Sequence, residues 1–107
     1  MDLKRLTEIV VRSWSFNEDT YPDLAGATPS ERTLFAMRHI LLHVQKDVGK
    51  LASVCEAADH RNKEINVYEV PLIVRNFLMN TLRLAEVAKV TPEELGQLVL
   101  KWEKEKR

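Results

Sequence analysis

The segment 34–58 constrains the fold of this chain more than any other part of the sequence. Its apolar side chains fall into two columns with a spacing of seven residues. The first column is Leu34, Leu41, Val48 and Cys55, and the second is Met37, Val44, Leu51 and Ala58. Such a repeat is typical of an α-helix that buries one side, and no proline interrupts it. We therefore expect a helix of about seven turns whose two apolar columns lie in the core.

A polar stripe runs along the same segment. It consists of His39, His43, Lys46, Asp47 and Lys50. The spacings of four, three, one and three residues keep these side chains together on one face of a helix. This stripe is therefore the first candidate for a functional surface.

The composition limits the classes of protein to which the chain can belong. Its 107 residues suffice for one domain, and 16 acidic residues balance 16 lysines and arginines. This balance argues against a partner that is a nucleic acid or an anionic membrane. The single cysteine, Cys55, excludes an internal disulfide, and we expect it to be a small buried hydrophobe. Because no 18-residue apolar window or hydrophobic signal core is present, we expect a cytoplasmic protein.

The N-terminal part of the chain is predicted to be a helix followed by a loop. Residues 2–14 have the apolar periodicity of a short amphipathic helix. Residues 15–27 are polar and rich in turn-forming residues. We expect Phe16, Tyr21 and Leu24 to hold this loop against the helices, and the alternative is an exposed aromatic contact for a ligand.

Two segments carry the chemistry of a helix start. In Thr28-Pro29-Ser30-Glu31, a threonine N-cap and a glutamate three residues later form a capping box, with proline at the first helical position. Thr91-Pro92-Glu93-Glu94 repeats this pattern. The first segment opens the long helix, which is expected to end near Asp59. The second opens the last helix, expected over residues 92–104.

The remaining helix lies between these two. Residues 60–63 lack apolar periodicity and are predicted to be a connecting turn. The next helix should begin between residues 66 and 71, because Pro71 is compatible with a first turn and not with an interior. Its apolar residues continue to about residue 89.

Together these elements predict an all-α domain spanning residues 1–107, a four-helix antiparallel bundle with two long central helices. Residues 1–27 form its N-terminal helix and loop, and residues 28–107 form its core helices. The wide apolar arcs exceed what four helices of this length bury among themselves. We therefore expect a homo-oligomer, a dimer or a tetramer.

Gly96 costs about 1 kcal/mol relative to alanine within the last helix, so we expect close packing there.

Two parts of the sequence resemble a known protein family. Residues 44–52, VQKDVGKLA, resemble the L-x-E-E-x-G-E-L-A segment of the MazG-like all-α nucleoside triphosphate pyrophosphohydrolases. Residues 82–86, LRLAE, and residues 90–95, VTPEEL, resemble the family's L-x-R-L-A, short turn and final helix. The similarity covers about residues 34–107, and it implies a MazG-like bundle.

In that family, carboxylates of E-x-x-E and E-x-x-D motifs hold magnesium, which positions the triphosphate and activates a water between its α- and β-phosphates. The resemblance maps these carboxylates onto Lys46, Asp47, Lys50, Ile73 and Asn76. Magnesium requires oxygen ligands, and an ammonium about 4 Å from it would be repelled by about 8 kcal/mol at an effective dielectric constant of about 20. We therefore expect a degenerate site with no metal and no cofactor. Magnesium would be expected only if the chain were active.

The charged part of the stripe allows three interpretations. Lys46, Asp47 and Lys50 could form a solvated charge cluster, worth a few tenths of a kcal/mol per pair. They could instead face another subunit and pair with Glu69 or Glu86. Third, the lysines could line an anion site that holds a phosphate-bearing ligand, such as a nucleotide, without metal. The candidate cleft for such a ligand consists of His43, Lys46, Asp47, Lys50, Asn76, Asn80 and Arg83.

The histidines and tryptophans favour structural roles. His39 and His43 are spaced for zinc, but zinc needs a third ligand, and we interpret them as partly buried histidines that face a neighbouring helix. Trp14 and Trp102 end the first and last helices and are expected to anchor the core or an interface.

Three classes of function remain open. We favour a MazG-like oligomeric binding or interaction module without the family's magnesium-dependent activity. The first alternative is an active nucleoside triphosphate pyrophosphohydrolase with relocated metal ligands. Its ligands would be Asp47 with Glu56, Asp59, Glu64 or Glu69. The second alternative is an unrelated small helical adaptor.

Overall fold

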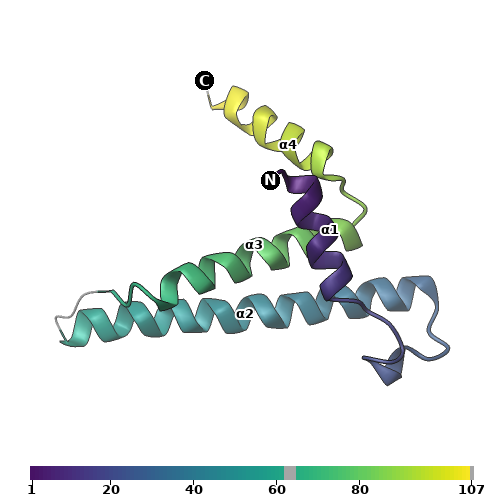
Figure 1. The fold of residues 1–107 in the computed structure, drawn as a ribbon, viewed down its shortest axis with the longest axis horizontal. Helices are drawn as coiled ribbons and strands as arrows, with labels where there is room; N and C mark the ends of the chain where they lie inside the picture. The colour runs from purple at the N-terminus through teal and green to yellow at the C-terminus, as the bar shows by residue number, and fades with distance from the viewer. Residues whose placement is uncertain (62–64, 107) are drawn as a thin grey trace.

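The computed structural model describes residues 1–61 and 65–106. Its elements are α1 (Leu3–Ser13), the short 3-10 helix η1 (Pro22–Leu24), α2 (Pro29–Arg61), α3 (Glu69–Val87) and α4 (Pro92–Glu105) (Figure 1). No strand occurs in these described residues, so the all-α prediction is confirmed. α2 is longer than expected because it includes His60 and Arg61, and the rest of the predicted turn lies outside the described residues.

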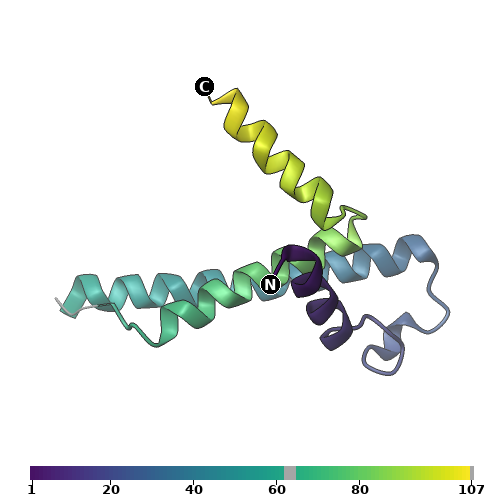
Figure 2. The ribbon, with the colours of Figure 1, turned by 45° about the horizontal axis from the view of Figure 1, so that its top comes forward.

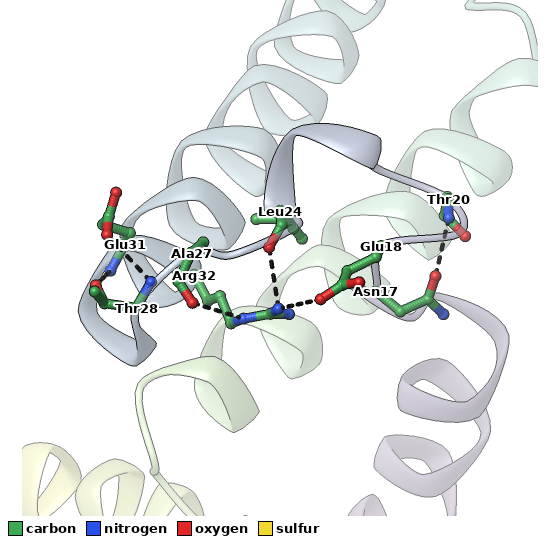
Figure 3. Close-up of polar contacts among 8 residues, drawn as sticks. All are labelled: Asn17, Glu18, Thr20, Leu24, Ala27, Thr28, Glu31 and Arg32. Carbon is green, nitrogen blue, oxygen red and sulfur yellow. Dashed lines mark hydrogen bonds and ion pairs between the residues drawn. The ribbon is translucent and has the colours of Figure 1, made fainter.

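The predicted helix starts are present with their hydrogen bonds. Glu31 N donates to Thr28 Oγ1 at 3.2 Å, and Thr28 N donates to Glu31 Oε1 at 3.1 Å, which completes the capping box (Figure 3). These bonds to Thr28 hold the pKa of Glu31 below its usual value. At the start of α4, Glu94 N donates to Thr91 Oγ1 at 3.1 Å.

The loop before α2 is fastened by Arg32, in the first turn of that helix. Its Nε donates to the carbonyl oxygen of Ala27 at 3.3 Å, and its Nη2 donates to that of Leu24 at 3.0 Å (Figure 3). The same Nη2 lies 2.7 Å from a carboxylate oxygen of Glu18. Leu24 itself is buried, so the loop is held to the helices as expected.

α2 and α3 run side by side in opposite directions, and α1 crosses them (Figures 1 and 2). α4 points away from this pair, as Figure 2 shows. The radius of gyration is 17.0 Å, whereas a compact domain of this length has about 13 Å. The helices are therefore arranged as an open assembly with little cover on its outer faces.

The core uses a different face of α2 from the predicted one. α2 buries Ala36, Ile40, Asp47 and Val54. The first predicted column is exposed: Leu34, Leu41 and Val48 are 52%, 54% and 52% accessible, and Cys55 is exposed too. The expectation that this column is buried is wrong. α3 covers only one side of α2, and that side is the one that carries Asp47.

α4 also departs from expectation. No residue of α4 is buried, and the helix starts after Lys89, whose φ of 64° lies in the left-handed region and turns the chain away from α3. A Cβ built on Gly96 would meet nothing within 4 Å, so the predicted close packing there is wrong. Trp102 is exposed, with Lys106 Nζ 5.2 Å from its ring centroid, and it anchors no core.

Candidate functional site

A pocket of about 360 Å³ lies where α1, α2 and α3 meet. Residues of the predicted cleft that line it are His43, Lys46, Asp47, Lys50, Asn76 and Asn80. Four of the five residues of the polar stripe of α2 and two amide residues of α3 therefore share one pocket, because the two helices are antiparallel neighbours.

The floor of the pocket is a buried carboxylate. Asp47 is 4% accessible, and its Oδ1 accepts a hydrogen bond from Asn76 Nδ2 at 3.0 Å. Asn80 Nδ2 lies 3.5 Å from Asp47 Oδ2. Arg75 orients Asn76, since its Nη2 donates to Asn76 Oδ1 at 2.9 Å. The interpretation of Asp47 as part of a solvated cluster is wrong, because its carboxylate is buried and held by two amides.

The two lysines lie at the rim. Lys50 Nζ is 4.0 Å from Asp47 Oδ1, and half of its side chain is accessible. Lys46 is exposed and forms no hydrogen bond or ion pair with any described residue. The pocket thus carries two positive charges against one negative charge, and the negative one lies beneath its surface. This charge balance favours an anionic ligand.

Asn80 leaves one buried acceptor without a partner. Its side chain is 5% accessible, and its Nδ2 donates to the carbonyl oxygen of Asn76 at 2.8 Å. Its Oδ1 has no hydrogen-bond partner among the described residues. Flipping the amide would place that oxygen against the Asn76 carbonyl and the Asp47 carboxylate, so the orientation is determined by the network. A buried acceptor of this kind requires a donor.

An aromatic wall closes one side of the pocket. Trp14, at the end of α1, donates from Nε1 to the hydroxyl of Tyr21 at 3.2 Å, and both residues line the pocket. The ring of His43 lies 5.0 Å from that of Trp14. The sequence allows an aromatic ligand contact in this loop, but nothing local predicts that residues 14 and 21 meet residue 43. The clustering of aromatics at the end of the first predicted helix was the only available signal.

The histidine pair belongs to this aromatic cluster. His39 stacks on Phe35 at 5.7 Å between ring centroids, and it lies 5.1 Å from the ring of His43. Burial among these rings lowers the pKa of His39, and the nearby His43 adds to this effect. No three histidine, cysteine, aspartate or glutamate side chains converge on a metal site anywhere in the described residues.

Two residues that the sequence associated with the site lie elsewhere. Arg83, predicted to line the cleft, is not among the pocket residues; its guanidinium lies 4.8 Å from the ring centroid of Phe16 and is paired with Glu86. Ile73, one of the five positions matched to the family's metal site, is fully buried in the core. The other four, Lys46, Asp47, Lys50 and Asn76, line the pocket.

The carboxylates considered as relocated metal ligands do not gather around Asp47. Glu56 lies nine residues further along α2, about 14 Å away along the axis, and its Oε1 is 3.9 Å from His60 Nε2. Asp59 is further still, and Glu69 begins α3. Glu64 lies outside the described residues. Glu86, considered as an ion-pair partner across subunits, already pairs with Arg83 within the chain.

Comparison with known proteins adds no relative. No protein-family model matches the chain, and neither the curated proteins nor the solved structures contain a significant match. Among the described helices, none combines the length and apolar character required to cross a lipid bilayer.

Proposed function

We propose that this chain is a MazG-like, cytoplasmic binding module that holds a phosphate-bearing ligand in the pocket between α1, α2 and α3. Lys46 and Lys50 contact the phosphate directly, and the family's magnesium-dependent hydrolysis does not take place. The observation that carries this proposal is that two rim lysines share one pocket with a single carboxylate, which amides already hold by hydrogen bonds.

The state of Asp47 supports binding without magnesium. Its Oδ1 accepts from Asn76 and its Oδ2 faces Asn80, so both oxygens point at amide donors. Lys50 Nζ lies 4.0 Å from Oδ1, so a cation bound to this carboxylate would lie close to the ammonium group. An ammonium at that distance repels a divalent cation strongly and attracts a phosphate.

The remaining walls suit a ligand with a flat, hydrogen-bonding part. Trp14 and Tyr21 offer aromatic surface on one side of the pocket. On the other side, the polar side chains of Asn76 and Asn80 line the pocket and can hydrogen-bond to N–H or O–H donors of the ligand. A nucleotide combines a flat base, such donors and a phosphate, so it is the ligand class that these groups fit best.

Titration calorimetry with ATP, dNTPs and pyrophosphate, each with and without magnesium, tests the proposal. We expect binding that does not require magnesium and that weakens at least ten-fold in the Lys46→Ala/Lys50→Ala variant. Lys101→Ala/Lys104→Ala removes the same charge from α4 and should bind as the unmodified chain does. An absence of heat at millimolar ligand, or equal binding by the first variant, contradicts the proposal.

The alternatives predict different results in the same experiment. A hydrolase with relocated ligands releases pyrophosphate from a dNTP in the presence of magnesium at an enzyme-like rate. A helical adaptor binds none of these ligands. The proposal requires ligand binding without that release.

A further inference from the structure

One face of α2 is apolar and uncovered. We call it the outer stripe, and it consists of Leu34, Leu41, Val48 and Cys55. All four are exposed, and they recur every seven residues along the longest helix. A soluble monomer rarely leaves a continuous row of large aliphatic side chains in water, because each buried CH₂ contributes about 0.8 kcal/mol.

The surface area of the chain indicates how much is left uncovered. The accessible area is 8287 Å², whereas a compact monomer of 12.4 kDa exposes about 6,100 Å². The excess is about 2,200 Å² per chain. A standard interface buries about 800 Å² per partner, and obligate dimers bury about 1,000–2,500 Å² per partner. The excess is therefore large enough for an obligate homodimer.

We propose that a second copy of this chain covers the outer stripe, with the two α2 helices packed antiparallel about a two-fold axis. A two-fold interface must be complementary to itself. The four stripe residues are spaced symmetrically about a point between residues 44 and 45. Antiparallel pairing about that point sets Leu41 against Val48 of the second copy and Leu34 against Cys55. The seven-residue spacing suits two helices packed at a small crossing angle.

The charges beside the stripe favour the antiparallel arrangement. Arg38 and Glu56 are 18 residues apart, or about five helical turns, so they lie on the same flank of the stripe. A parallel pair would place the Arg38-bearing halves of both helices at one end and the Glu56-bearing halves at the other. An antiparallel pair places the half of α2 that carries Arg38 along the half that carries Glu56. Antiparallel helix dipoles also attract each other.

The stripe is separate from the pocket, so the two proposals can fail independently. On a helical projection at about 100° per residue, Lys46 and Lys50 lie on another side of α2 from Leu41 and Val48. A dimer formed through the stripe leaves the pocket lysines free. Loss of the dimer should leave the number of phosphate sites per chain unchanged.

Sedimentation velocity on the full chain tests whether the outer stripe is a dimer interface. We expect about twice the chain mass at micromolar concentration, and the mass of one chain for Leu41→Glu/Val48→Glu with unchanged helical circular dichroism. The matched control is Leu98→Glu/Val99→Glu on α4, where both side chains are similarly exposed, and it should remain a dimer. A monomeric unmodified chain, or an assembly that only the α4 variant dissociates, overturns the proposal.

Cross-linking tests the orientation without charged substitutions. In L34C, position 34 and Cys55 of one chain are about 32 Å apart along α2, too far for a disulfide within the chain. Under a copper–phenanthroline oxidant, the antiparallel dimer should form disulfides that join position 34 of one copy to Cys55 of the other, identified by peptide mass spectrometry. L34C/C55S should lose them. Rapid Cys55–Cys55 linkage in the unmodified chain, or no linkage in L34C, overturns the antiparallel stripe.

Discussion

Arg83 Nε donates a hydrogen bond of 2.7 Å to the main-chain oxygen of Trp14. This contact joins the C-terminal part of α3 to the last carbonyls of α1, which have no partner within their own helix. The same guanidinium lies over the ring of Phe16 and pairs with Glu86. Arg83 therefore holds the aromatic wall in position through Trp14, although Arg83 does not line the pocket itself.

Replacing Arg83 should loosen that wall. Arg83→Met removes a buried hydrogen bond to Trp14 and leaves Glu86 without its partner, so we expect a loss of about 2–4 kcal/mol in the free energy of unfolding. Urea denaturation measures this. Arg12→Met, an exposed position near the end of α1, should change stability by less than about 0.5 kcal/mol. Equal stability of the two variants would show that the Trp14 contact contributes little.

Removing the charge of Asp47 should strengthen anion binding. A unit charge about 8 Å from a phosphate contributes about 1 kcal/mol at an effective dielectric constant of about 40, so Asp47→Asn should bind pyrophosphate several-fold more tightly. Its stability should drop by about 1–3 kcal/mol, because one acceptor for the Asn76 and Asn80 amides is lost. Asp59→Asn, exposed on α2, is the control. Weaker binding by Asp47→Asn that occurs only with magnesium would instead assign Asp47 a role as a metal ligand, and weaker binding without magnesium would contradict the expected electrostatic effect.

The aromatic cluster should make stability depend on pH. Burial lowers the pKa of folded His39, so the unfolded chain takes up a proton more readily than the folded one. His39 therefore contributes its full stability above the unfolded pKa, and this is lost as pH falls from there toward the folded pKa. Unfolding measured from pH 7.5 to 5.5 should show this decline, and His39→Phe should flatten it.

The other two histidines need controls in that experiment. His60 is exposed near the end of α2, so His60→Gln should keep the decline of the unmodified chain. His43 faces His39 at 5.1 Å between ring centroids and helps to lower the pKa of folded His39, so His43→Gln should make the decline smaller by bringing that pKa closer to its unfolded value. An identical pH profile for His39→Phe and the unmodified chain would contradict the assignment.

The turn between α3 and α4 stores backbone strain that can be relieved. Lys89 has a φ of 64°, a conformation that costs a residue with a Cβ about 1 kcal/mol. Lys89→Gly should therefore raise the free energy of unfolding by about 1 kcal/mol, and the melting temperature by several degrees. Ala88→Gly, at the preceding C-cap with a φ of −81°, should be neutral or destabilising. Calorimetry distinguishes these outcomes.

Local sequence chemistry predicted the helix starts because each depends on residues within one turn. Thr28 with Glu31, and Thr91 with Glu94, make their capping bonds whatever the rest of the chain does. The same locality explains the polar stripe: His43, Lys46 and Lys50 share a face in any helix, and four of the predicted site positions on α2 do line one pocket.

The sequence by itself determined that the chain is helical, where two of its four helices start by side-chain capping, and which side chains share a face. Only the tertiary structure decided which face is buried. The seven-residue apolar repeat places Leu41 and Val48 on one face of a helix. Whether these side chains are buried depends on whether a neighbouring helix packs against that face. α3 packs on the side of α2 that carries Asp47, and Asn76 and Asn80 there supply the hydrogen bonds that a buried carboxylate requires. These three polar residues, up to 33 positions apart, share one pocket, whereas no described helix covers the outer stripe.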